Sequence, residues 1–544
     1  MNFDNVDVYD YGHLGLVAGF IKQVGLVDYI DRVIPKTKLC HVSHGQAVAA
    51  MLLNSLGFHS QSLYLVPEYF SDKPIDLLIA PGIYSEHLND DVLGRTLDAV
   101  FDYGVSSLYS ELAIKTLNTL KITPKAINLD LTSFHVDGTA YNDNTSGDTD
   151  KFIRIVQGYS RDHRPELNQI ILALITENQA GIPIYLEALI GNAEDKSTFQ
   201  DIITSQLDLL KAAENSQYLI ADSALYTKAT IQSLHEKNRY FITRVSSVSN
   251  DAKAVSNRPD LAAFMPICDG YEGYYTDSNY ADVPQKWLVI RSQAGRERAL
   301  KTFDKDVAKG KLREEKQLSS LMKTNFSCEH DALSRLEEFK RELKYTEIKD
   351  YQINSIAQYS GRGAPKKDAE PVGYKYTITA NLEICEAKLE EAKLKLGIFI
   401  LSTNDINNTP DMHELLSLYK SQQRVERGFR FLKDPSFMTS SFFVEKPSRI
   451  EALLFLMTTA LMIYAGLEHQ IRTTLKENKK TVTNSMKKQT DNPTLKWLFL
   501  KFTKIKCLIV DKTTVYIKGI DEEHRHIIRL LGEPYESIYR EVKK

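Results

Sequence analysis

The sequence predicts an α/β fold, in which a mixed β-sheet with helices on its faces follows a helical region and is interrupted by an insertion. Residues 1–120 carry helical periodicity and capping signals, whereas residues 126–247 alternate between strand and helix patterns. The pattern changes again over 249–395 and returns to a buried strand at 397–403. With 544 residues, the chain is long enough for several domains and a sizeable core.

Helices are expected throughout the N-terminal 120 residues. One helix is expected to begin at Ser43, a good N-cap residue, and to stop at Gly57. A second is expected to begin at Asn89 or Asp90 and to stop at Gly104. No residue in this region has the spacing of a catalytic or metal-binding group.

The sheet is expected to begin after Pro124. Strand patterns and helical patterns follow one another in the order β-β-β-α-β-α-β. The first strand is expected at 126–136, and the stretches 153–160 and 169–190, the latter broken by a turn from Asn178 to Gly181, are expected to form two or three further strands. Later strands are expected at 218–226 and 239–247, and helices at 196–214 and 227–238. Within the following insertion we expect a strand at 285–293 and solvated helices in the highly charged stretch 301–349. The expected domains are therefore a helical N-terminal domain (1–120), the first part of the sheet domain (121–248), the insertion (249–395), the second part of the sheet domain (396–470) and a linker with a small module (471–544).

Composition restricts the location and the partners of the chain. The net charge of -3 means that any nucleic-acid contact has to come from local basic patches. Five scattered cysteines without a Cys-x-x-Cys pair indicate a reducing compartment, and the acidic N-terminus is not a secretory signal, so we expect a cytoplasmic protein. The uncharged stretch from Ala452 to Leu467 is shorter than the about twenty residues of a spanning helix, so we expect a buried core helix and no membrane contact.

The stretch 415–433 predicts an amphipathic helix with an unusual distribution of charge. Tyr419, Glu426 and Lys433 are seven residues apart and therefore share one helix face. Glu426 is the only acid between Tyr419 and Lys433, among the basic residues Lys420, Arg424, Arg427, Arg430 and Lys433. A lone carboxylate in a phosphate-binding surface makes chemical sense if it holds a metal ion. The alternative is a solvated basic helix that carries one ordinary glutamate.

Two further acids stand at matching positions in the predicted sheet. Asp130 lies within the first strand and Asp222 at the end of the fourth, and in a sheet of this order these two strands can be neighbours. If the basic helix packs across the sheet, Glu426 reaches the same edge. Three convergent carboxylates suit two Mg²⁺ ions, because hard cations prefer oxygen ligands. Two such ions can activate a water or a 3′-hydroxyl and stabilise the leaving oxygen in phosphodiester displacement.

Each of the two aspartates also has a structural explanation. Asp130 can bond Thr132 or Ser133 within its strand, and Asp222 can cap the turn that follows it. Other carboxylates are of the right type but do not stand at the matching ends of elements, namely Asp137, Glu187 and Asp195.

These residues together resemble the DDE transposases of bacterial insertion sequences. The resemblance rests on Asp130 in NLDLTSFHVDG, Asp222 in IADSALY and the helix YKSQQRVERGFRFLK. It is closest to the superfamily whose signature is Tyr, two residues, Arg, three residues, Glu, six residues and Lys. The stretches LYLVPEYF, HLNDDVLGRTLDA and GYSRDHRPELNQI are similar to one subgroup, so the resemblance extends over essentially the whole chain.

The resemblance implies a fold, a site and partners. It implies an RNase H-like sheet domain with an insertion, an N-terminal domain that binds the DNA ends, and two Mg²⁺ ions (or Mn²⁺) held by Asp130, Asp222 and Glu426. It implies that Tyr419 and Lys433 contact the end of the element beside the cleavage point, and that the assembled complex is a homodimer on double-stranded DNA. The signature arginine falls at Gln422, which can donate a hydrogen bond to phosphate but carries no charge. Arg424, Arg427 and Arg430 are the neighbouring cations expected to bind DNA.

The stretch GRGAPKK, 361–367, is a further candidate for DNA contact. It resembles the Arg-Gly-Arg-Pro hook that enters A·T-rich minor grooves, although Ala364 replaces the second arginine. Arg362, Lys366 and Lys367 are expected to bind phosphates, and an exposed basic turn is the alternative.

The sequence therefore predicts a transposase that cuts DNA at the inverted-repeat ends of its element and joins the 3′ ends to target DNA. An RNase H-like nuclease that hydrolyses without strand transfer is an alternative within enzymes. A catalytically inactive DNA-binding descendant is an alternative of a different class, and the glutamine at position 422 is the residue that favours it.

Overall fold

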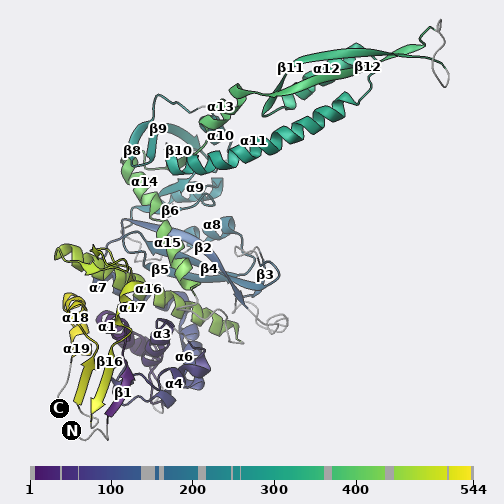
Figure 1. Cartoon of the computed structure of the whole chain (residues 1–544). Coiled ribbons are helices and arrows are strands. Elements are labelled where there is room, and N and C mark those ends of the chain that lie inside the picture. The colour runs from purple at the N-terminus through teal and green to yellow at the C-terminus, as the bar shows by residue number, and fades with distance from the viewer. Residues whose placement is uncertain are drawn as a thin grey trace.

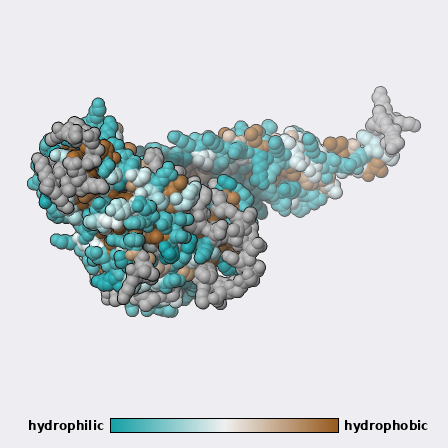
Figure 2. Space-filling model, turned by 90° about the horizontal axis from the view of Figure 1, so that it is seen from below, coloured by the Kyte–Doolittle hydropathy of each residue, from teal (hydrophilic) through white to brown (hydrophobic). Residues whose placement is uncertain are grey.

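The structure is a computed structural model in which a body of helices and sheets carries one long arm (Figure 1). It describes residues 6–36, 40–58, 61–136, 153–158, 164–205, 216–246, 249–257, 259–360, 370–434, 446–510 and 514–540. Figure 2 shows the arm from below as a projection whose surface is mainly hydrophilic, with scattered hydrophobic side chains. The site predicted from the sequence lies in the body, so the sheet that forms its centre is described first.

The centre of the body is a ten-stranded mixed sheet. Its strands follow the order β3-β4-β2-β6-β7-β13-β10-β9-β8, and β5 pairs with β4. The pairs β2–β6 and β6–β7 are parallel, and the other pairs are antiparallel. The strands are β2 (Ala126–Val136), β3 (Val156–Gln157), β4 (Asn168–Glu177), β5 (Pro183–Ile190), β6 (Tyr218–Ala221), β7 (Tyr240–Arg244), β8 (Met265–Cys268), β9 (Tyr271–Tyr280), β10 (Val283–Ser292) and β13 (Ile398–Thr403).

The alternation of strands and helices predicted for the sheet domain is confirmed, but four strands rather than three precede the first helix, because the stretch 169–190 divides into β4 and β5 at the predicted turn. Helix α8 (Asp195–Ser205) precedes β6, and α9 (Lys228–Glu236) connects β6 to β7, as the alternating patterns predict. Strands β4, β2 and β6 are buried along almost their whole length, which is the pattern of a sheet covered on both faces. This is the mixed α/β core, RNase H-like in its order, that the sequence predicts.

The sheet extends into the range expected to be the insertion. Strands β8, β9 and β10 continue the sheet through β13, and α10 (Asn250–Asn257) precedes them. The boundary expected at residue 249 therefore does not coincide with the edge of the sheet. The physical reason is the partner of β13, because β10 pairs with it over Lys286–Arg291 and joins the segment before the arm to the segment after it.

The arm consists of two long helices and a hairpin with a small core of their own. Its buried residues include Leu318, Leu336, Phe339 and Ile378. The buried carboxylate of Glu314 accepts hydrogen bonds from the backbone N–H groups of residues 344 and 346, at 2.8 and 3.1 Å, and so ties the long helix to the start of the hairpin. The elements are α11 (Gln293–Met322), α12 (Glu329–Glu342), β11 (Thr346–Gln358), β12 (Gly373–Ile384) and α13 (Glu386–Leu394).

The two ends of the chain form one unit at the other end of the molecule (Figure 1). The N-terminal region is helical as predicted, except that it begins with β1 (Val6–Asp10), which pairs with β16 in a three-stranded sheet. The ring of Tyr535 occupies the space that a Cβ at Gly19 would fill, with 2.4 Å to the nearest ring atom, so the last helix packs directly on the first. The N-terminal helices are α1 (Leu14–Val24), α2 (Leu26–Val33), α3 (His44–Ser55), α4 (Val66–Tyr69), α5 (Ile75–Leu78), α6 (Asp90–Tyr103) and α7 (Val105–Leu120).

The C-terminal segment is more ordered than a linker. The polar stretch after 477 forms a short hairpin of β14 and β15 before the small module that the sequence predicts. Ser43 and Asn89 cap α3 and α6 as predicted, and α6 ends at Gly104. The C-terminal elements are β14 (Val482–Thr483), β15 (Gln489–Thr490), α17 (Leu495–Phe502), β16 (Lys506–Val510), β17 (Thr514–Lys518), α18 (Glu522–Leu531) and α19 (Tyr535–Ile538).

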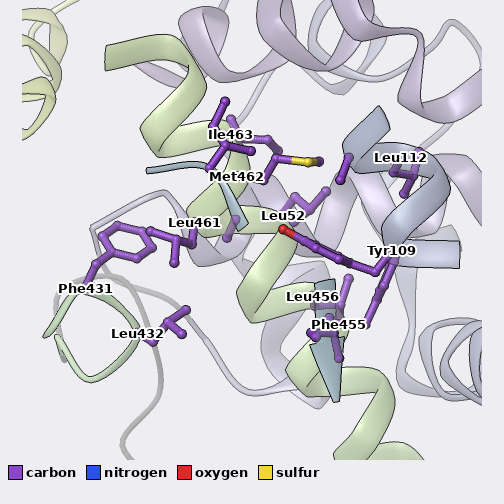
Figure 3. Packing of buried hydrophobic residues seen from close by; sticks show 14 of the residues in the cluster. Leu52, Tyr109, Leu112, Phe431, Leu432, Phe455, Leu456, Leu461, Met462 and Ile463 are labelled. Atoms are coloured by element: carbon purple, nitrogen blue, oxygen red, sulfur yellow. The ribbon is translucent and has the colours of Figure 1, made fainter. Parts of the chain in front are cut away.

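Helix α16 (Pro447–Glu477) joins the sheet domain to this unit. It is long and apolar enough to cross a membrane by length and composition alone, and 72% of its most apolar window is buried within the protein. Figure 3 shows Leu456 and Met462 of α16 packed among Leu52 of α3 and Tyr109 of α7, with Phe431 on its other side. Packing inside the protein therefore accounts for its apolar composition, as expected for a core helix.

Candidate active site

The helix predicted over 415–433 is divided into two. It consists of α14 (Met412–Lys420) and α15 (Gln423–Leu432), and Ser421 and Gln422 form a tight turn between them. The backbone N–H of Gln422 donates to the carbonyl of Tyr419 at 3.1 Å, which is an i→i−3 bond. The Ser421 hydroxyl donates to the Leu418 carbonyl at 2.6 Å and also lies 3.1 Å from Oδ1 of Asn128 in β2. The interruption thus coincides with the point where the helix touches the sheet.

Helix α15 runs along β2. At one end Ser421 lies beside Asn128, and at the other end Nζ of Lys433 lies 5.7 Å from the ring centroid of Phe134. The twelve residues between the two helix positions span about 18 Å, and the six between the two strand positions span about 20 Å. The two elements therefore point in the same direction over matching lengths.

This alignment brings Glu426 level with Asp130. From Ser421, Glu426 lies five residues further, a rise of about 7.5 Å along a helix. From Asn128, Asp130 lies two residues further, a rise of about 6.6 Å along a strand, and on the same face of the sheet. Glu426 is exposed and Asp130 is half-buried, so both carboxylates lie where the helix meets the surface.

The register of the parallel strands places Asp222 beside Asp130. Asn128 of β2 pairs with Ile220 of β6, and two residues further along both strands stand Asp130 and Asp222. The two aspartates therefore lie next to each other on the same face, as the sequence predicts for neighbouring first and fourth strands. Oδ1 of Asp130 accepts a hydrogen bond from the N–H of Leu131 at 2.8 Å, and Oδ1 of Asp222 from that of Ala224 at 2.9 Å.

All three carboxylates act electrostatically on one phenol. Burial raises the pKa of Tyr419, and the negative charges of Asp222, Glu426 and Asp130 raise the pKa further, while Arg244 lowers it. The Tyr419 hydroxyl therefore stays protonated at neutral pH and can donate a hydrogen bond. Carboxylates from two strand ends and one helix thus all lie within electrostatic range of Tyr419.

The donor set fits a divalent cation in ligand type. Three carboxylates with hard oxygen donors lie along one edge of the sheet, and such donors are the ones that Mg²⁺ and Mn²⁺ prefer. In the described part of the chain, no three His, Cys, Asp or Glu side chains stand close enough together to share one ion. Joint coordination by Asp130, Asp222 and Glu426 therefore requires side chains to move toward one another.

Arg244 is a site residue that sequence reasoning missed. Ala221 of β6 pairs with Thr243 of β7, so Asp222 and Arg244 stand next to each other at the carboxyl ends of these parallel strands. The guanidinium is exposed, and its charge acts on Tyr419 more strongly than any of the three acids does. The signal was present in RYFITRVSS, where an arginine ends a buried strand that is the parallel neighbour of the one ending at Asp222.

The predicted DNA-binding residues of the helix fall into four groups. Lys433 lies on the side of α15 that faces β2, and Tyr419 at the end of α14 lies within electrostatic range of the carboxylates. Gln422 is buried, with 9% of its surface exposed, so its amide does not reach a surface phosphate in this structure. Arg424 donates from Nη1 to the carbonyl of Asn178 at 2.6 Å and packs over Gly181, so it fixes α15 to the turn between β4 and β5.

The remaining predicted cations are placed differently. Arg427 and Arg430 are exposed on α15 and line a cleft on the side away from β2. The basic stretch with Arg362, Lys366 and Lys367 lies outside the described residues.

Two protein families match parts of this chain. A family described as a transposase DDE domain matches residues 125–463, more than half of the chain, and this range includes all three carboxylates. A family described as a domain of unknown function (DUF4277) matches residues 6–114, within the N-terminal helical region. No curated protein matches. Among solved structures, the cryo-EM structure of a piggyBac transposase synaptic complex with hairpin DNA aligns over 90% of this chain and 79% of that chain, at 8% identity and a TM-score of 0.36.

Proposed function

Because this chain belongs to the transposase DDE domain family, we propose that it moves an insertion sequence by cutting DNA at the inverted-repeat ends and joining the 3′ ends to target DNA. The observation that carries the proposal is that strand register and the contact of Ser421 with Asn128 place Asp130, Asp222 and Glu426 along one edge of the sheet. Within the family, we assign the chain to the bacterial superfamily with the Tyr-Arg-Glu-Lys signature. We further propose that it acts in the cytoplasm as a homodimer that pairs two DNA ends.

Asp130, Asp222 and Glu426 are the residues that would hold divalent metal ions, Mg²⁺ or Mn²⁺. When bound, such ions supply Lewis-acid stabilisation of the phosphate and a nucleophile at neutral pH. The sheet fixes the two aspartates relative to each other through the parallel register of β2 and β6. Glu426 is held on a separate helix, so docking of α15 against β2 sets the third position.

The remaining site residues bind and orient the DNA. The protonated hydroxyl of Tyr419 donates a hydrogen bond to a phosphate oxygen, and the ammonium of Lys433 attracts the same backbone. Arg244 supplies a planar guanidinium that suits phosphate recognition, at the end of β7 next to Asp222. It provides a positive charge at the site, where the signature arginine is replaced by the buried Gln422.

One observation favours the inactive, DNA-binding alternative. The signature arginine is absent, and the glutamine in its place points into the protein. If a phosphate contact at that position is essential, the protein binds DNA ends without cutting them.

The test is cleavage and strand transfer on a labelled duplex that carries the terminal repeat of the element, with Mg²⁺ or Mn²⁺. The wild type is compared with Glu426→Gln, which keeps the size of the side chain and removes its charge. We expect metal-dependent 3′-end nicking and joining that the variant loses while it still binds the duplex. Nicking without joining indicates the nuclease alternative, and binding without nicking by either protein indicates the inactive descendant.

A further inference from the structure

The side of α15 away from β2 forms a second, strongly basic surface. A cleft of about 690 Å³ lies between α15, the C-terminal half of α16, the turn at 179–181 and the segment 492–496. We call it the α15–α16 groove. Its walls carry two acids, Asp434 and Glu468, and six cations, Arg424, Arg427, Arg430, Arg472, Lys476 and Lys496.

The acids of the groove are already neutralised. Nη1 of Arg472 lies 2.7 Å from Glu468, and Nζ of Lys496 lies 3.0 Å from Asp434. Arg427 and Lys476 are exposed, and among the described residues neither has an ion pair with an acid. The groove therefore presents an excess of positive charge that the protein itself does not compensate.

The cations lie close enough to oppose one another. Burial lowers the pKa of Arg472 and of His469. Arg427 lowers the pKa of Arg472 further, against the opposing charge of Glu468, and Arg424 lowers the pKa of His469 further. Like charges held together in a partly buried cleft destabilise the protein unless an anion joins them. The arrangement is therefore that of a binding site for an anion with several charges.

The groove adjoins the carboxylate site. Arg430 lines it and stands four residues after Glu426, one helical turn of about 6 Å along the same helix. A DNA strand with its reacting phosphate at Tyr419 and Glu426 would meet these cations next. The side chain of Leu461 in α16 occupies the space that a side chain at position 428 would need. The glycine at 428 therefore lets α15 and α16 approach closely, and this distance determines the width of the groove.

We propose that the α15–α16 groove binds the phosphate backbone of the DNA segment that adjoins the reacting phosphate. The proposal rests on the proposed function for the identity of the anion. It gives a role to part of the chain that no family match covers, because His469, Arg472, Lys476 and Lys496 lie beyond residue 463.

The first test is the salt dependence of DNA binding by the full-length chain. A short fluorescent duplex is titrated between about 50 and 200 mM salt. The groove variant Arg427→Gln/Lys476→Gln is compared with Lys305→Gln/Lys309→Gln, which removes two exposed charges from α11 of the arm. The slope of log K against log salt changes by about 0.9 per phosphate contact, so we expect the groove variant to lose about 1.8 and the arm variant to keep the wild-type slope.

Either of two results would overturn the proposal, namely an unchanged slope in the groove variant or an equal reduction in both variants.

A second measurement does not depend on the folding of a variant. Acetylation of lysines in the wild-type protein, read by mass spectrometry with and without duplex, should show protection of Lys476 and none of Lys309. Equal protection of both lysines contradicts a specific groove.

The groove and the proposed function fail separately. Binding slopes report the groove, whereas the loss of cleavage in Glu426→Gln reports the carboxylates. One outcome is that Glu426→Gln still cleaves DNA while the groove variant shows a reduced slope of log K against log salt. This outcome supports the groove as a DNA-binding surface and contradicts the proposed chemistry. If the slope is unchanged while Glu426→Gln abolishes cleavage, the groove proposal falls alone.

Discussion

The two sides of α15 hold charge in different ways. On the side toward β2, three acids lie within electrostatic range of Tyr419, and the register of parallel strands fixes the two aspartates among them. On the side toward α16, cations gather, and only the packing of one helix on another brings them together. In a sheet, hydrogen bonds between backbones fix which residues are neighbours. Between two packed helices, the side chains at their contact determine the shape of the groove. We therefore assign chemistry to the first side and binding to the second.

The largest expected effect separates these two roles. Asp222→Asn keeps an oxygen for the N–H of Ala224, so we expect the fold to persist and the cleavage rate to fall on the order of 10³-fold or more. Duplex affinity should change by less than about threefold, which is below 1 kcal/mol. Arg427→Gln should show the opposite pattern, with weaker binding and an undiminished rate at saturating DNA. Single-turnover cleavage measures the rate and fluorescence anisotropy measures the affinity. If both variants lose rate and affinity alike, the two sides of α15 do not have separate roles.

Arg244 tests whether the carboxylate side needs a cation of its own. We expect Arg244→Gln to reduce the single-turnover rate by about 10²-fold, because one preorganised donor to developing phosphate charge is lost. Arg244→Lys should recover part of this loss, since it retains the charge but not the planar fork. If glutamine and lysine variants are equally impaired in stability and unimpaired in rate, Arg244 serves only to support the end of β7.

Gly428 lies at the contact of α15 with α16, on the groove side. A Cβ at this position would lie 3.0 Å from Cδ2 of Leu461, so Gly428→Val pushes α15 away from α16. We expect a loss of about 1–3 kcal/mol in the free energy of unfolding, typical of an overpacked interface. Gly373→Ala is the control, because nothing lies within 4 Å of the Cβ it would add. Denaturant melts of both variants measure the difference, and equal stabilities would mean that the helix contact tolerates a side chain.

The smallest expected effect is a pH dependence of the groove. The pKa of His469 lies below its usual value, so this side chain is neutral when an unfolded histidine, with a pKa of about 6.5, becomes protonated. The folded protein therefore loses stability as pH falls below about 6.5. A bound polyanion raises the pKa of His469, so duplex affinity should increase modestly as pH falls from 7 toward 5.5. NMR titration of His469 with and without duplex measures both shifts, and His469→Asn should flatten the pH dependence of binding.

Sequence patterns predicted the parts of the fold that local signals determine. Ser43 and Asn89 begin their helices as expected, and Asp130 and Asp222 stand side by side because strand order fixes parallel register. The strand at Val6–Asp10 was missed, since its partner lies at Lys506–Val510 and nothing local indicates that pairing.

The parts of the site that depend on packing were not predictable in the same way. The helical periodicity continues through Gln422, yet the contact of Ser421 with Asn128 interrupts the helix and Gln422 is buried. The charge of Arg424 alone predicted a phosphate contact, but its guanidinium donates a hydrogen bond to the carbonyl of Asn178 instead. Arg244 gains its place at the site only through the neighbour of its strand.

The most direct test of the central claim is the position of a metal ion in a structure with DNA. Crystals of the full chain with a terminal-repeat duplex and Mn²⁺ give anomalous difference density that locates the ion independently of any activity. The account predicts density within coordination distance of carboxylate oxygens of Asp130 and Asp222, with Glu426 turned toward it and Tyr419 on the neighbouring phosphate. Ordered DNA at this edge of the sheet, with Mn²⁺ density elsewhere and the three carboxylates still apart, would contradict it.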